Sequence, residues 1–152
     1  MTWKIFERWF NMPPAKDAKY ITDNQGEKFW IFWRNKFERV VKLHIWYRGR
    51  PVGVVSSLRE EDNSITLADI TIFERYRLRG RGLGKAMMQE FIRWATENEF
   101  KEIWGCIKAH DGSTTEYLRE WYKRQGFKVY EAKPGIYHIL LELQNEQSSI
   151  SR

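Results

Sequence analysis

An arginine- and glycine-rich segment is the part of this sequence whose residue types point most directly to chemistry. Between Arg75 and Lys85 the chain carries five cationic side chains in eleven positions, three glycines and no acid. The segment follows a run predicted as a strand and leads directly into a predicted helix. Glycines at a helix start let backbone N–H groups approach an anion closely, and the helix N-terminus adds partial positive charge. The segment is therefore predicted to form a cradle for phosphate groups.

The glycine spacing excludes two familiar nucleotide-binding loops. A P-loop, G-x-x-x-x-G-K-[ST], does not fit because only four residues separate Gly80 from Lys85 and Ala86 follows the lysine. The dinucleotide fingerprint G-x-G-x-x-G does not fit because Gly80, Gly82 and Gly84 are spaced by two and two. The phosphates are thus expected to belong to another kind of ligand.

The segment Arg79–Gly84 fits the pattern R/Q-x-x-G-x-G/A, the pyrophosphate loop of the GNAT superfamily of acyl-CoA-dependent N-acyltransferases, which this chain resembles. The segment from Thr115 to Phe127 looks like that family's N-x-x-A-x-x-x-Y-x-K-x-G-F element, and the likeness covers about residues 39–143. A second register beginning at Arg77 also satisfies R-x-x-G-x-G. We prefer the register that begins at Arg79, because its motif glycines, Gly82 and Gly84, then lie directly at the start of the predicted helix.

The resemblance implies acetyl-CoA as co-substrate, without a metal. It implies that backbone groups in the strand before the loop bind the pantetheine arm and the thioester carbonyl, and that the loop binds the pyrophosphate. Thr115 stands where the family commonly has an asparagine that contacts pantetheine. The cofactor-binding residues expected from the resemblance are Ile70, Thr71, Ile72, Arg77, Arg79, Gly80, Arg81, Gly82, Leu83, Gly84, Lys85, Thr115 and Tyr122.

The resemblance also implies that Tyr122 protonates the leaving thiolate. A tyrosine can do so if it lies within hydrogen-bond reach of the sulfur; the alternative is a core aromatic on the helix stripe it shares with Leu118. Asp69 and Glu74 are the candidate general bases. His110-Asp111 is a further candidate, and a water relay would need no dedicated base.

The implied function is transfer of an acetyl group from acetyl-CoA to a primary amine by direct attack in a ternary complex. The alternative is a non-catalytic acyl-CoA-binding regulatory module. A nucleic-acid binder that uses the basic loop is a third, less favoured hypothesis. The sequence does not name the acceptor, a small molecule or a protein, and it leaves open whether a homodimer forms.

Alternating and helical apolar patterns predict the elements that position these residues. The expected fold class is α/β (α+β mixed sheet), a GNAT-like fold with a mostly antiparallel sheet splayed at the CoA site and helices on both faces. Residues 15–28 are expected to be polar with a turn at Asp23–Gly26. The expected strands are 29–33, 40–47, 52–58, 65–73, 101–109, 127–132 and 136–143, and the expected helices lie within 1–12, 84–99 and 113–125.

In the family, two helices follow the first strand and cap the acceptor site. Here only Asn35–Glu38 separates Trp33 from the next expected strand. The acceptor site is therefore expected to be built differently, from the N-terminal helix, with Trp30, Trp33 and Trp46 as candidate lining residues.

Composition places the chain among single-domain proteins. With 152 residues, of which 42% are apolar, one GNAT-like domain over residues 1–143 is expected, with a disordered tail at 144–152. The net charge of +6 suits an anionic partner. No long uncharged apolar run occurs, so a cytoplasmic protein without a membrane partner is expected. The single cysteine, Cys106, is expected to pack as a small apolar residue.

Overall fold

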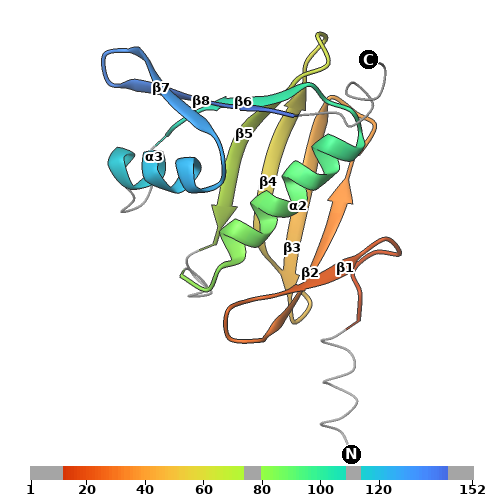
Figure 1. Ribbon diagram of the computed structural model, residues 1–152. Coiled ribbons are helices and arrows are strands. Elements are labelled where there is room, and N and C mark those ends of the chain that lie inside the picture. Colours follow the sequence, from red (N-terminus) through yellow and green to blue (C-terminus); the bar gives the residue numbers. More distant parts are fainter. Residues whose placement is uncertain (1–11, 74–79, 109–113, 144–152) are drawn as a thin grey trace, which may run out of the picture. The chain divides into compact units, whose positions relative to one another are not determined.

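The computed structural model describes residues 12–73, 80–108 and 114–143 (Figure 1). Its strands form one sheet in the order β1-β2-β3-β4-β5-β6-β8-β7. The β5–β6 pair is parallel, whereas β1–β2, β2–β3, β6–β8 and β7–β8 are antiparallel. This mixed sheet with helices confirms the predicted fold class. The elements are β1 Lys19–Thr22, β2 Lys28–Arg34, β3 Val40–Tyr47, β4 Arg50–Arg59, β5 Ile65–Ile72, α2 Leu83–Glu97, β6 Glu102–Cys106, α3 Thr115–Arg124, β7 Lys128–Lys133 and β8 Ile136–Glu142.

The predicted elements agree with these bounds to within about two residues, except at the N-terminal side and in β6, which ends at Cys106 although a strand to 109 was expected. The sequence pattern missed β1, a four-residue strand in which no side chain is buried. Such a strand has no apolar alternation to reveal it, and it exists because its backbone pairs with β2 across a tight turn. Residues 1–11 of the expected N-terminal helix, and the expected tail at 144–152, lie outside the described residues.

The described parts of Met1–Ser56 and Asp69–Met87 form one compact unit. Its β2 and β3 strands pair so that Ile31 lies opposite Ile45 and Trp33 opposite Leu43. In β3 the buried side chains alternate with exposed or half-exposed ones, whereas β2 buries Phe29 and Ile31 on one face and Phe32 on the other. The core side chains of this unit are Phe29, Ile31, Phe32, Val41, Leu43, Ile45, Val52, Val55, Leu83 and Met87.

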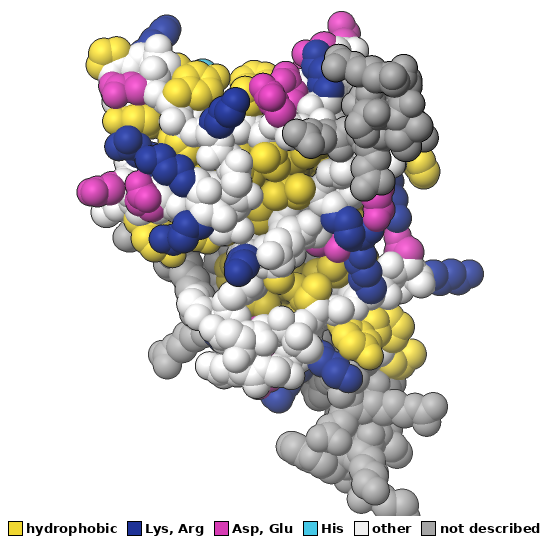
Figure 2. Space-filling model, viewed as in Figure 1, with side chains coloured by type: hydrophobic (Ala, Val, Ile, Leu, Met, Phe, Trp, Pro, Cys, Tyr) yellow, Lys and Arg dark blue, Asp and Glu magenta, His cyan; other side chains and the backbone are white. Residues whose placement is uncertain are grey.

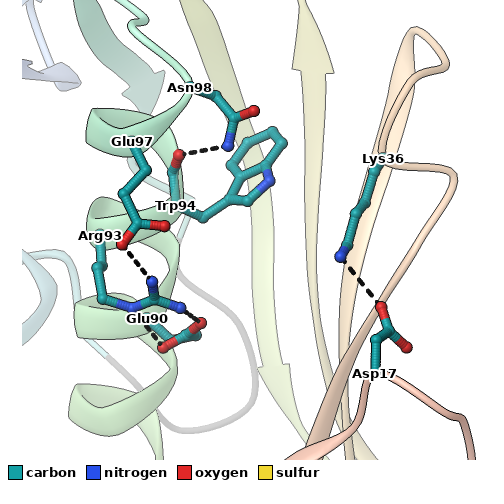
Figure 3. A network of polar contacts seen from close by, with 7 residues as sticks. All are labelled: Asp17, Lys36, Glu90, Arg93, Trp94, Glu97 and Asn98. Atoms are coloured by element: carbon teal, nitrogen blue, oxygen red, sulfur yellow. Dashed lines mark hydrogen bonds and ion pairs between the residues drawn. The ribbon is translucent and has the colours of Figure 1, made fainter.

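The described parts of Ser57–Ala68 and Met88–Arg152 form a second compact unit. Most of α2 belongs here, and its apolar stripe brings the Trp94 ring within 6.1 Å of Phe91 and 5.4 Å of Phe100, centroid to centroid. On α2, Arg93 bridges Glu90 and Glu97, with 2.5 Å between its Nη1 and Glu97 Oε1 (Figure 3). Glu90 is nearly buried, and Arg93 supplies a charge partner for its carboxylate.

The structure of strand β6 shows that the predicted packing of Cys106 in the core is wrong. Ile103 and Gly105 are buried, whereas Trp104 and Cys106 between and after them are exposed. Because successive strand side chains point to opposite faces, Cys106 falls on the exposed face and does not pack in the core. At Gly105 an added Cβ would lie 2.8 Å from the carbonyl oxygen of Leu67, so the parallel β5–β6 contact has no room for a side chain there.

Neither described helix combines the length and the apolar character needed to cross a bilayer.

Candidate functional site

The glycine loop, defined here as Gly80–Lys85, is the described part of the predicted phosphate cradle. Gly80 and Gly82 have φ values of +78° and +80°, a conformation that glycine adopts without strain. The Gly82 carbonyl accepts the Ala86 N–H at 3.1 Å, which makes it the first acceptor of α2. The next three N–H groups, those of Leu83, Gly84 and Lys85, therefore have no partner within the helix.

This backbone has the form of an anion-binding concavity. Left-handed residues at the start of a helix turn successive N–H groups toward one side, where they and the helix dipole attract negative charge. Gly80, Gly82 and Lys85 are exposed, whereas Leu83 is buried and fixes the first turn of α2 in the core. The loop thus fits a phosphate-bearing ligand such as acetyl-CoA. Arg77, Arg79 and Glu74 lie outside the described residues.

Arg81 has a different setting from its glycine neighbours. Its side chain is only 16% exposed, and its Nη2 lies 2.5 Å from Asp23 Oδ2 and 3.1 Å from Glu27 Oε2. Burial lowers the pKa of the guanidinium, but its close pairing with the Glu27 and Asp23 carboxylates outweighs this, so the net shift of the pKa is upward. Its positive charge is therefore already balanced by two carboxylates from the β1–β2 turn.

Strand β5 carries the residues expected beside the thioester. Among the described residues, β5 pairs with β6 only through Ile65–Leu67, at the start of β5. The later residues, Ala68–Ile72, are exposed or half exposed. The Thr71 hydroxyl donates to Asp69 Oδ2 at 2.7 Å, so two residues of one strand face share a hydrogen bond. Asp69 is exposed and free of the core, as a group that meets substrate must be.

Gly53 is a residue near this strand that the sequence pattern did not reveal. An added Cβ would lie 2.6 Å from Ile45 Cγ2 and 2.8 Å from the Thr71 carbonyl oxygen. Just beyond, the Phe73 N–H donates to the Val52 carbonyl at 2.9 Å. The absence of a side chain at Gly53 therefore permits the close approach of β4 to the end of β5. A glycine inside an apolar strand is the only signal that the sequence offers for this role.

Tyr122 lies in the second unit, on α3. It is 8% exposed and makes edge-to-face contacts with Trp121 and Phe127 at 5.1 and 5.7 Å between ring centroids. Thr114 caps the helix by accepting the Tyr117 N–H at 3.0 Å, so Thr115 is the first helical residue and is half buried. The burial of Tyr122 is consistent with both predicted roles, core aromatic and proton donor. His110 and Asp111 lie outside the described residues.

Within residues 12–73, 80–108 and 114–143, no group of three or more His, Cys, Asp or Glu side chains could hold a metal ion.

Comparison with known proteins identifies the family. The model of the acetyltransferase (GNAT) family matches residues 3–127. N-acetylaspartate synthetase of Xenopus tropicalis is 29% identical over 96 residues, which are 62% of this chain and 35% of that protein. The chain thus spans about a third of the length of that relative.

Solved structures share the fold. The GNAT domain of S. lividans PAT superposes with a TM-score of 0.70 at 10% identity, covering 87% of this chain and all of that one. A Bacillus subtilis acetyltransferase in complex with CoA gives a TM-score of 0.55 at 19% identity, covering 71% of this chain and 80% of that one. An Elizabethkingia anophelis GNAT acetyltransferase with acetyl-CoA bound gives 0.56 at 13% identity, covering 69% and 77%.

The family model covers most of the chain, the fold superposes on a solved GNAT domain, and the glycine loop opens α2 as the motif requires. The chain belongs to the acetyltransferase (GNAT) family, whose acyl donor is acetyl-CoA.

Proposed function

We propose that this chain is an N-acetyltransferase that moves an acetyl group from acetyl-CoA to a primary amine by direct attack in a ternary complex. We place the activity in one domain over residues 1–143 and the protein in the cytoplasm. The observation that carries the proposal is the glycine loop. Two left-handed glycines precede a helix start whose first N–H groups have no helical partner, in a chain of the acetyltransferase family.

In this proposal the backbone N–H groups of Gly80–Lys85 bind the pyrophosphate, with Lys85 adding a charge-assisted contact from its exposed position. The motif also assigns Arg77 and Arg79 to these phosphates. The backbone of Ile70–Ile72 binds the pantetheine arm and the thioester carbonyl. An N–H donor aimed at that oxygen stabilises the negative charge that develops as the amine attacks.

The proposed reaction forms a C–N bond between the neutral amine and the thioester carbonyl carbon and breaks the C–S bond. The amine loses a proton to Asp69, to Glu74 or to water, and the departing thiolate takes one from Tyr122. Binding both substrates in one complex supplies much of the rate enhancement, because it replaces an encounter in solution with a fixed geometry. Thr71 holds the Asp69 carboxylate through the 2.7 Å hydrogen bond.

The proposal is tested by thiol release from acetyl-CoA over a panel of primary amines, together with calorimetric titration of CoA. CoA binding with amine-dependent thiol release is the expected result. CoA binding without release for any amine would instead favour a non-catalytic acyl-CoA-binding module. An absence of CoA binding would contradict both functions.

A further inference from the structure

The turn between β1 and β2, Asp23–Glu27, is held by several hydrogen bonds within the turn. The Asp23 side chain has no exposed surface, and its Oδ1 accepts the N–H groups of Gln25 and Glu27 at 2.9 and 2.8 Å. The Asp23 N–H also donates to the Glu27 carbonyl at 2.9 Å. The conformation of the turn is therefore fixed by hydrogen bonds within the turn itself, chiefly to the buried Asp23 carboxylate.

This turn holds the glycine loop, which lies more than fifty positions later in the chain. The Asn24 N–H donates to the Arg81 carbonyl at 2.9 Å, and Asn24 Nδ2 donates to the Gly80 carbonyl at 3.1 Å. A Cβ added at Gly82 would lie 3.9 Å from Asn24 Cβ, so the turn also passes close to the loop at this glycine. One asparagine thus engages two successive carbonyls of the loop.

The direction of these carbonyls sets the direction of the loop's amides. In a trans peptide the N–H points opposite to the C=O of the same unit, and the described chain has no cis peptide. Because the Gly80 and Arg81 carbonyls face Asn24, the N–H groups of Arg81 and Gly82 face away from the turn. Neither N–H donates to another described residue. They extend the row of N–H groups at the start of α2.

Arg81 completes the attachment. Its guanidinium lies between Asp23 and Glu27 and over the Phe29 ring, 5.8 Å from the centroid. The ion pairs are close, although the Nη2 protons do not align with the carboxylate oxygens as hydrogen bonds. The Glu27 carboxylate is held in turn by a hydrogen bond with Tyr47 on β3. The loop is thereby tied to the β-sheet through side chains as well as backbone.

We propose that Asp23, Asn24, Glu27 and Arg81, here named the loop clamp, position the glycine loop so that its amides face the pyrophosphate of acyl-CoA. Arg81 then acts through the turn and is not itself a phosphate ligand. The inference rests on the proposed function only in taking acyl-CoA as the ligand. It adds Asp23 and Asn24 as positioning residues for the donor.

The test measures the dissociation constant of CoA by calorimetry for Asn24→Ala and Asp23→Asn. The second change keeps an oxygen for the turn N–H groups and removes the charge that faces Arg81. Each is expected to weaken CoA about tenfold, the scale of one misplaced charge-assisted hydrogen bond. Asp17→Asn is the matched control, since Asp17 pairs with Lys36 at 3.0 Å outside the clamp (Figure 3) and should leave CoA affinity unchanged.

A double-mutant cycle separates positioning from direct contact. If the clamp acts as a unit, Arg81→Gln, Asp23→Asn and the double variant should weaken CoA by similar factors, because the second change removes nothing further. If Arg81 binds phosphate directly, Arg81→Gln should weaken CoA while Asp23→Asn leaves it unchanged. That second pattern would overturn the inference. These titrations need no turnover, so a chain that binds CoA but acetylates nothing still tests the clamp.

A truncated donor checks that the effect is local. S-acetylpantetheine lacks the pyrophosphate, so its kcat/KM should be the same in Asn24→Ala as in the unmodified chain. For acetyl-CoA the same variant should raise KM about tenfold and change kcat by less than about twofold. An equal loss with both donors would show a general structural defect and overturn the inference, and so would an unchanged KM for acetyl-CoA.

Discussion

The Asp23 carboxylate is buried yet remains charged. Its burial raises the pKa, but the N–H groups of Glu27 and Gln25 and the positive charge of Arg81 outweigh this, so the pKa lies below its usual value of 3.8. A carboxylate with a lowered pKa in the folded state stabilises that state above the pKa of the unfolded chain. That stabilisation is lost as the pH falls through the native pKa.

The pH dependence of Asp23→Asn follows from this sign. At pH 7 the variant should have a lower free energy of unfolding than the unmodified chain, because an uncharged amide cannot pair with Arg81. The difference should begin to shrink as the pH falls below about 3.8, where the carboxyl of the unfolded chain gains a proton, and should vanish below the lower native pKa. Urea denaturation of both proteins from pH 7 to pH 3 measures it. A difference that grows toward acid would contradict the assignment.

Tyr122 provides the clearest test of the proposed chemistry. Tyr122→Phe keeps the ring contacts with Trp121 and Phe127 but removes the hydroxyl. If the Tyr122 hydroxyl donates the proton to the thiolate, its removal should lower kcat about a hundredfold with little change in KM for acetyl-CoA. Tyr117→Phe is the control, because Tyr117 lies on the same helix and is 55% exposed.

An unchanged kcat in Tyr122→Phe would assign this tyrosine to the core of its unit and remove it from the reaction.

The sequence revealed some of these residues and not others. The glycine loop was predictable because its glycines, cations and following helix are contiguous. Asp23–Gly26 was predicted only as a turn, because its bonds to Gly80 and Arg81 join positions far apart in the sequence. For the same reason Arg81 was expected to bind phosphate, although its nearest charged partners are Asp23 and Glu27.

The secondary-structure elements were predicted wherever their apolar pattern is strong. Strand β3 has the expected bounds because Val41, Leu43 and Ile45 alternate with exposed or half-exposed residues. Helix α2 was found from its apolar stripe. Strand β1 was missed because pairing with β2, and not burial, forms it. Local pattern therefore predicts elements with a buried face, whereas a short edge strand depends on its neighbour.

The contact of β4 with β5 gives a prediction at the level of elements. Gly53→Ala would place a methyl group 2.6 Å from Ile45 Cγ2 and 2.8 Å from the Thr71 carbonyl oxygen, and a backbone atom cannot swing aside. Such overpacking should lower the free energy of unfolding by about 1–3 kcal/mol. Because the displaced segment includes Thr71, kcat/KM for acetyl-CoA should fall as well.

Thermal or urea denaturation and steady-state kinetics measure the two effects of Gly53→Ala. A variant as stable and as active as the unmodified chain would show that β4 and β5 have room for a side chain there.

For the chain as a whole, family membership rests on the match over residues 3–127, and the fold agrees with several solved acetyltransferases. The acceptor amine is a separate question, since N-acetylaspartate synthetase shares only part of its length with this chain. In Figure 2, Lys and Arg side chains are interspersed with acidic and apolar ones on the face shown, an arrangement that does not favour a nucleic-acid groove.

The central claim is that the backbone of the glycine loop binds the pyrophosphate of an acyl-CoA. An amide proton–nitrogen NMR titration with CoA, repeated with inorganic pyrophosphate, tests it most directly. We predict that the amide signals of Arg81, Gly82 and Lys85 shift in both titrations, because their N–H groups become donors to phosphate oxygens. Signals of these residues that stay in place while CoA binds and shifts others would contradict the claim.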